Sequence, residues 1–178
     1  MTNLGEDMEK ILAVFKKGIE LESFGIKFYT EAADEVTDPK GRQTLQFLAN
    51  EERDHWSFIV DLKHSFESGN ESSAKKIINK RSESKAHSTV FPKMEDFSEK
   101  IAESKGDEKI LEEAEDIEKR SIEFYTSAMA DVKDPAHSDI FNILIREENG
   151  HLQLVHQMRD YMILHGVWSR LEDYFANE

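Results

Sequence analysis

Residues 22–39, ESFGIKFYTEAADEVTDP, decide how the rest of the chain is interpreted, because residues 118–135, EKRSIEFYTSAMADVKDP, repeat them after a shift of 96 positions (118 − 22). Both segments contain the triplet Phe-Tyr-Thr and end in Asp-Pro. The same shift places NEERDHWSFI, residues 50–59, on REENGHLQLV, residues 146–155, and both keep the pattern Glu-Glu-x-x-His. A constant shift without gaps over such a distance indicates a duplicated structural unit.

Each copy of the unit predicts a helical hairpin. The pairs Asp38–Pro39 and Asp134–Pro135 are typical helix starts, with Asp as the N-cap and Pro in the first helical position, where its missing N–H is not needed. The whole chain of 178 residues has only 8 Gly and 3 Pro, which favours long helices. We therefore expect an all-α four-helix bundle whose helices lie near residues 6–36, 39–66, 107–132 and 135–164.

The expected single domain covers residues 1–178: hairpin 1 at about 6–66, a long crossover at about 67–106, hairpin 2 at about 107–165 and a short C-terminal helix at about 167–176. That last helix is expected to fold Trp168 and Phe175 back onto the bundle. The crossover carries a basic group of side chains, namely Lys75, Lys76, Lys80, Arg81 and Lys85. The favoured interpretation is a solvated linker or a short packed helix, and the alternative is a docking site for an acidic partner.

Composition excludes several function classes. The net charge of −14 argues against binding to nucleic acids and against adsorption to anionic membranes. The absence of cysteine excludes disulfides, thiolate zinc sites and iron–sulfur clusters from these residues, so a metal here must use His, Asp or Glu. No secretory signal is visible and no apolar run approaches the length of a membrane span, which predicts a cytoplasmic protein.

Charged residues interrupt the apolar faces of all four long helices. Each face carries one central glutamate, and two faces add a histidine one turn later; the residues are Glu22, Glu52, His55, Glu118, Glu148 and His151. Four buried carboxylates would each cost several kcal/mol unless they are compensated. Two divalent cations would offset four carboxylates, and positions i and i+3 share one helix face. Carboxylate and imidazole ligands suit iron, manganese or zinc.

Several neighbouring residues have weaker signals. Glu51 and Glu147 lie about 100° around the helix from the central glutamates, so they are interpreted as boundary residues that support the ligands. Tyr29 and Tyr125 follow two of the glutamates on the same face and are either core aromatics or phenols that hydrogen-bond a ligand carboxylate. The remaining histidines are expected at the surface: His64, His87, His137, His156 and His165.

With these motifs the chain resembles the ferritin-like di-iron carboxylate proteins and, more narrowly, the rubrerythrin group. The likeness rests on ELESFGIKFYTEAADEVTDP, ANEERDHW, AEDIEKRSIEFYTSAMADVKDP and REENGHL and covers roughly residues 10–65 and 108–165. The resemblance implies that the six residues at the centre of the four faces hold two iron ions. It further implies reduction of hydrogen peroxide with electrons from a redox partner.

The chain departs from that family pattern at two points. Classical rubrerythrins carry a cysteine-ligated iron domain, which a chain without cysteine cannot contain, so an external electron-donor protein is expected. They also place an extra carboxylate one turn from the glutamate of the third helix, whereas this chain has Ser121 after Glu118 and Glu115 before it. Glu115 is therefore a further candidate ligand.

The sequence thus predicts a di-iron oxidoreductase that acts through its metals on hydrogen peroxide or dioxygen, as a homodimer. Glu52 and Glu148 are expected to bridge the two metals, Glu22 and Glu118 to be terminal ligands, and His55 and His151 to bind one metal each. Two alternatives stay open: a ferroxidase or iron-handling protein without peroxidase turnover, and a bundle that binds a non-redox metal such as zinc.

Overall fold

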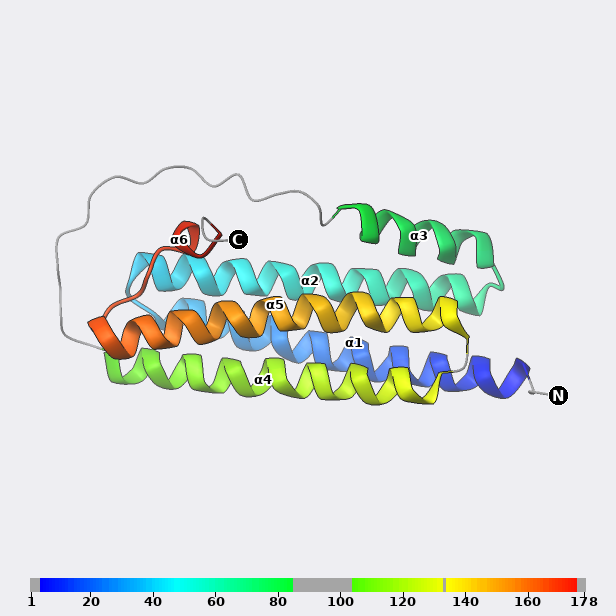
Figure 1. The fold of residues 1–178 in the computed structure, drawn as a ribbon, viewed down its shortest axis with the longest axis horizontal. Coiled ribbons are helices and arrows are strands. Elements are labelled where there is room, and N and C mark those ends of the chain that lie inside the picture. The colour runs from blue at the N-terminus through cyan, green and yellow to red at the C-terminus, as the bar shows by residue number, and fades with distance from the viewer. Residues whose placement is uncertain (1–3, 85–103, 133, 176–178) are drawn as a thin grey trace.

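Four long helices lie side by side in a bundle in the computed structural model, which describes residues 4–84, 104–132 and 134–175 (Figure 1). Their bounds are α1 Leu4–Glu35, α2 Pro39–Glu67, α4 Ser104–Asp131 and α5 Pro135–His165. Helices α1 and α2 form one antiparallel hairpin, and α4 and α5 form the other. The predicted all-α, ferritin-like architecture of two hairpins is confirmed.

The start of α2 shows why the hairpin turns at the Asp-Pro pair. The Asp38 carboxylate accepts a hydrogen bond of 2.8 Å from the Lys40 backbone N–H, and Pro39 occupies the first turn of the helix. The cap occupies one of the N–H groups that a helix start leaves without an intrahelical partner, and the proline presets the helical φ angle. At the second pair, the Asp134 carbonyl accepts from the backbone N–H groups of His137 and Ser138, so the first turn of α5 follows this residue.

The interior consists of two apolar clusters with a polar layer between them. One cluster gathers around Tyr29, Leu45 and Met158, and the other around Phe15, Ile59 and Phe141. On each of the four helices the apolar residues of the two clusters flank a buried glutamate: Glu22, Glu52, Glu118 and Glu148. The charged residues of the sequence pattern therefore share one layer, which is closed by apolar packing at both ends.

The crossover contains a helix, α3, which spans Glu71–Ser84 and lies along α2 (Figure 1). Ala74 is buried in the apolar cluster around Phe15, and Ile77 and Ile78 pack against that cluster. The described part of the crossover is thus a short helix packed along α2. Lys85 and His87, for which the sequence made predictions, lie outside the described residues.

The C-terminal segment folds back at the opposite end of the bundle from α3 (Figure 1). Gly166 ends α5 with φ at 70°, and α6 spans Leu171–Phe175. Trp168 is fully buried over Gly41, where an added Cβ would lie 2.4 Å from the indole ring, and its Nε1 donates to Asp107 at 2.9 Å. Among the described residues, no helix combines the length and the apolarity that a bilayer crossing requires.

Candidate metal centre

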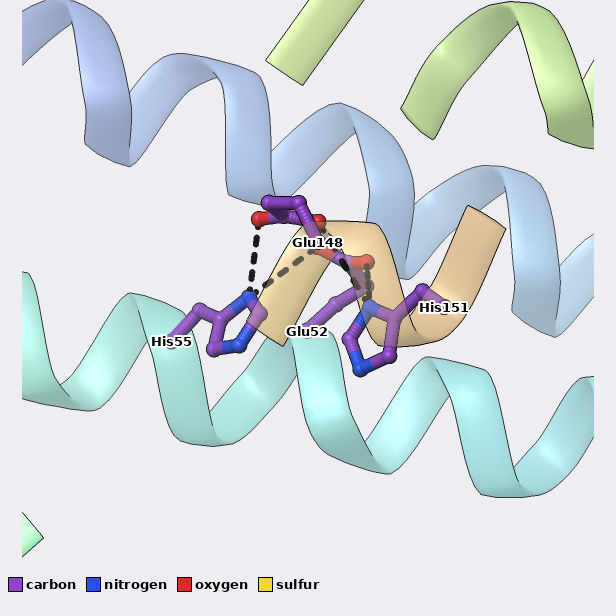
Figure 2. A group of neighbouring side chains, drawn as sticks. All are labelled: Glu52, His55, Glu148 and His151. Atoms are coloured by element: carbon purple, nitrogen blue, oxygen red, sulfur yellow. Dashed lines mark ion pairs between the residues drawn. The ribbon is translucent and has the colours of Figure 1, made fainter. Parts of the chain in front are cut away.

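The six residues that the sequence predicts as metal ligands lie together in the polar layer. All are 5% exposed or less, and they come from all four long helices: Glu22, Glu52, His55, Glu118, Glu148 and His151. Figure 2 shows the two Glu-x-x-His pairs of α2 and α5, whose side chains point toward one another. The imidazole rings of His55 and His151 are stacked, with 5.1 Å between their centroids. Helical spacing explains the pairing, since i and i+3 lie on one face.

Two glutamates are shared between the histidines. Glu148 places Oε1 3.0 Å from Nδ1 of His55 and Oε2 3.5 Å from Nδ1 of His151. Glu52 is arranged in the same way, with Oε2 4.0 Å from Nδ1 of His55 and Oε1 3.5 Å from Nδ1 of His151. Each of these carboxylates therefore presents one oxygen to each half of the site. This is the arrangement that a bridging carboxylate requires.

The other two glutamates each belong to one half. Oε2 of Glu22 lies 3.5 Å from Nδ1 of His55, and Oε2 of Glu118 lies 3.7 Å from Nδ1 of His151. Their Oε1 atoms accept hydrogen bonds from tyrosine hydroxyls of the opposite hairpin: Tyr125 donates to Glu22, and Tyr29 donates to Glu118. Both tyrosines are thus buried aromatics that also hydrogen-bond a candidate ligand. One oxygen of each glutamate is held, and the other faces the centre.

The atoms that face the centre fit a pair of metal ions. Six of them have no hydrogen-bond partner within the described part of the chain: Oε2 of Glu22, Oε2 of Glu118, both oxygens of Glu148, and Nδ1 of His55 and of His151. Ligands at about 2.0–2.2 Å from a metal ion lie roughly 3 Å or slightly more from one another, which is close to the spacings found here. Among the described residues, only histidine side chains pair with the four carboxylates as cations. Two divalent ions would supply the missing positive charge.

The metal-free centre holds protons in place of that charge. Burial lowers the pKa of His55, but the carboxylates of Glu148, Glu147 and Glu22 outweigh it and hold this pKa well above its usual range. His151 behaves in the same way: burial lowers its pKa, but the hydrogen bonds with four neighbouring carboxylates raise the pKa by more than burial lowers it. Both imidazoles are therefore stabilised as cations when no metal is bound. Metal binding must displace their protons, which makes it pH-dependent.

Three of the carboxyl groups have shifted pKa values: those of Glu52 and Glu118 are raised, and that of Glu148 is lowered. Burial raises the pKa of Glu118 to about 7, and burial together with the charge of Glu148 raises the pKa of Glu52 well above its usual range. Burial also acts to raise the pKa of Glu148, but the nearby histidines His55 and His151 outweigh it and lower that pKa. Glu148 is thus the anionic centre of the metal-free cluster, which agrees with its position between the two imidazoles.

The comparisons with known proteins agree with this geometry. The family model for rubrerythrin matches residues 13–158, which is most of the chain and includes all six residues of the cluster. The chain belongs to the rubrerythrin family. The search of the curated proteins and the search of the solved structures gave no match.

Glu115, the further candidate ligand in this rubrerythrin-family chain, lies in a different cluster. Its carboxylate is 3.0 Å from Nδ1 of His156, 3.1 Å from Nζ of Lys119 and 3.6 Å from Nη1 of Arg159. Burial raises its pKa, but the contacts with His156 and Lys119 outweigh this and lower the pKa. The structure does not bring Glu115 to the six-residue cluster, so its role as a ligand stays a prediction.

The outward-facing nitrogens of the two histidines also meet acidic residues. Nε2 of His55 lies 3.1 Å from Oε2 of Glu147, and Nε2 of His151 lies 3.7 Å from Oε2 of Glu51. The sequence placed both acids at the boundary of the core. The boundary position is wrong for Glu147, which is buried and accepts hydrogen bonds from Arg81 of α3, while its contact with His55 is of the supporting kind that was expected. In the sequence, Arg81 is recognisable only as part of the basic group in the crossover.

Proposed function

We propose that this protein reduces hydrogen peroxide to water at two iron ions held by the six-residue cluster, with electrons from an external donor protein. The observation that carries the proposal is the position of Glu148, whose two oxygens are divided between the two imidazoles at 3.0 and 3.5 Å. A carboxylate in this position could contribute one oxygen to each of two metal ions. Membership of the rubrerythrin family supports iron as the metal.

The reaction consumes one hydrogen peroxide, two electrons and two protons and releases two waters. When bound by the cluster, two ferrous ions would supply one electron each, and reduction of the O–O bond consumes two electrons. The surrounding residues exclude bulk water, because the polar layer is closed by apolar clusters on both sides. The hydrogen bonds from Tyr29 and Tyr125 fix the orientation of Glu118 and Glu22 before any metal binds, which reduces the reorganisation that binding requires.

Electrons have to reach the centre from outside these residues. The sequence has no cysteine and therefore no thiolate-ligated iron centre of its own. The donor protein and the homodimer remain predictions.

The test begins with ferrous loading under anaerobic conditions and elemental analysis of the desalted protein. We expect about two irons per chain, as the ligand count of the cluster implies. Addition of hydrogen peroxide should then oxidise the protein-bound iron, with one peroxide consumed for each pair of irons, and faster than dissolved dioxygen does. The Glu52→Ala variant, treated in the same way, reports the background from adventitious iron, and His151→Ala should lose part of the bound iron.

Other outcomes would redirect the proposal. Many irons per chain, together with a large assembly in solution, would indicate iron storage. Faster oxidation by dioxygen than by peroxide would indicate a ferroxidase. Unchanged metal content in both variants would refute the ligand set itself.

A further inference from the structure

A cavity of about 690 Å³ lies at the end of the bundle where α1, α3 and α5 begin and where α2 and α4 end (Figure 1). All five helices contribute to its wall, so the cavity is a feature of the tertiary structure and not of one hairpin. Its volume is in the range of small-molecule sites in proteins. None of its described lining residues belongs to the six-residue cluster, which makes it a separate candidate site.

The wall of the cavity combines an apolar interior with charged groups. Ile11, Ala74 and Ala128 line it and are buried, and the rings of Phe66 and His137 meet there with 5.0 Å between their centroids. The charged lining residues of the described chain are four acids and two lysines: Asp7, Glu71, Asp131, Asp134, Lys10 and Lys75. An apolar, partly aromatic interior favours a ring compound, and the excess of carboxylates disfavours a ligand with a phosphate group. A neutral ring with hydroxyl or carbonyl oxygens fits both features.

A series of aromatic rings connects this wall with the metal centre. The ring of Phe66 lies 5.4 Å from that of Phe15, Phe15 lies 6.5 Å from Phe141, and Phe141 lies 6.4 Å from Tyr125, measured between centroids. All three distances are in the range of aromatic pairs in contact. The Tyr125 hydroxyl donates to Glu22 of the six-residue cluster. The rings therefore form an unbroken path of contacts from the cavity to a candidate metal ligand.

The proposed peroxide reduction needs two electrons and two protons in each turnover, and a hydroquinone carries both. When its two O–H bonds break, it becomes a quinone, so that one hydroquinone and one hydrogen peroxide give one quinone and two waters. The protons pass to the carboxylates around the cavity and to water. Electron transfer through a protein slows steeply as the gaps between packed atoms widen, so a path of rings in contact favours it. No ring in the path has to be oxidised or reduced itself.

We propose that this cavity binds a neutral hydroquinone, which acts as a small-molecule reductant of the metal centre beside the expected donor protein. The electrons travel along the path Phe66, Phe15, Phe141 and Tyr125. The role as a reductant rests on the proposed function, whereas the binding of the ligand does not.

Duroquinone and its reduced form, duroquinol, are the probes for the test, because their rings have no free position that a lysine amine could attack. Binding of duroquinone is measured on the metal-free protein by NMR of methyl-labelled methionines. We expect the methyl signal of Met8, which lines the cavity, to shift on addition of duroquinone. The signals of Met158 and Met162, which belong to the apolar cluster around Tyr29, should stay unchanged.

The Ala13→Trp variant places a large ring in the cavity from an exposed position on α1. We expect duroquinone to cause no shift of the Met8 signal in this variant. The matched control is Ser57→Trp, at an exposed position on α2 that does not line the cavity, and it should keep the shift. If Ala13→Trp does not fold, Lys75→Trp fills the cavity from α3 instead.

The path of rings is tested by mixing iron-loaded, peroxide-oxidised protein with duroquinol under anaerobic conditions and following its reduction by stopped-flow spectroscopy. We expect Phe141→Leu, which removes the ring between Phe15 and Tyr125, to slow the reduction several-fold without weakening duroquinone binding. Phe124→Leu is the matched control, because Phe124 contacts Tyr125 at 5.1 Å but lies outside the path. Ala13→Trp should slow reduction by duroquinol and leave oxidation by peroxide unchanged.

The absence of a Met8 shift in the wild type, or an equal shift in Ala13→Trp, would overturn the binding site. Reduction by duroquinol at the same rate in Ala13→Trp and the wild type would overturn the role as a reductant. An unchanged rate in Phe141→Leu, or an equal slowing in Phe124→Leu, would overturn the path. Failure of peroxide to oxidise the ferrous wild type is a different result, because it refutes the proposed function and leaves the binding measurement valid.

Discussion

Hairpin α1–α2 and hairpin α4–α5 present matching groups to the metal centre but bury them differently. On the inner side, each hairpin contributes two glutamates and one histidine, and each receives a tyrosine hydroxyl from the other. On the outer side, Glu147 is buried under Arg81, while its counterpart Glu51 is partly exposed. The inner half of the site is nearly two-fold symmetric, and the outer half is not.

This comparison separates the features that a two-metal site would require from those that the rest of the chain adds. Two adjacent cations would require the same kinds of ligand on both sides, and both copies of the repeat supply them. The described helices that follow the two hairpins differ, since α3 spans Glu71–Ser84 and α6 spans Leu171–Phe175.

The strongest way to break the symmetry is to remove a ligand that both halves share. We expect Glu148→Ala to lower the iron content from about two ions per chain to well below one, because both positions lose a ligand, whereas His55→Ala should retain about one. Elemental analysis after anaerobic ferrous loading measures this. The exposed Glu123→Ala is the matched control on α4. If Glu148→Ala keeps one iron as His55→Ala does, Glu148 serves only one half.

The tyrosine hydrogen bonds test whether the two hairpins support each other equally. Tyr29→Phe and Tyr125→Phe each leave a buried carboxylate oxygen without its donor, so we expect each to lower the free energy of unfolding of the metal-free protein by about 1–3 kcal/mol. Urea titration followed by circular dichroism measures the loss. Tyr161→Phe, at an exposed position, should change little. A large loss for only one of the two buried tyrosines would contradict the inner symmetry.

The thermal stability of the metal-free protein should decrease as the pH rises. Folding raises the pKa of His55 and His151 well above the usual range and that of Glu118 to about 7, so the folded state binds more protons than the unfolded state. Stability from these groups is present below their unfolded pKa values and is lost as the pH rises through the folded values. We therefore expect the melting temperature of the metal-free protein to fall between about pH 6 and pH 9.

The metal-loaded protein is the control for this experiment, because its ligands stay deprotonated over that range and its melting temperature should depend less on pH. The pKa of Glu148 is lowered instead, and its contribution is lost only at acidic pH. A melting temperature of the metal-free protein that rises from pH 6 to pH 9 would contradict the predicted protonation of the cluster.

The smallest expected effect concerns Gly25, whose repeat counterpart is Ser121. A Cβ at Gly25 would lie 3.0 Å from Oε2 of Glu52, so Gly25→Ala should displace that carboxylate and weaken Co²⁺ binding by up to about tenfold. The gain in helix propensity should keep the change in unfolding free energy below about 1 kcal/mol. Gly150→Ala, in a helix interior with open space around the added Cβ, is the matched control. Equal Co²⁺ affinity in both variants would mean that Glu52 is not confined by α1.

Most of the fold and the inner ligand set follow from patterns inside single helices. The Asp-Pro starts, the 96-residue repeat and the glutamates within apolar faces place Glu22, Glu52, Glu118 and Glu148 in one layer without knowledge of the packing angles. The two interpretations of Tyr29 and Tyr125 could not be separated in this way, because a hydroxyl facing a carboxylate on another hairpin leaves no signal in its own helix. The same holds for Glu147, whose burial depends on a helix from outside the repeat.

By itself, the sequence determined the helices, their pairing into hairpins and the residues that face the core, because helical periodicity acts over a few residues. Only the tertiary structure decided that Glu148 and Glu52 each present one oxygen to each histidine, that the tyrosine bonds cross between hairpins, and that Arg81 buries Glu147 behind His55. These features depend on distances between segments remote in the chain. Packing sets such distances, and the pattern along one helix does not contain them.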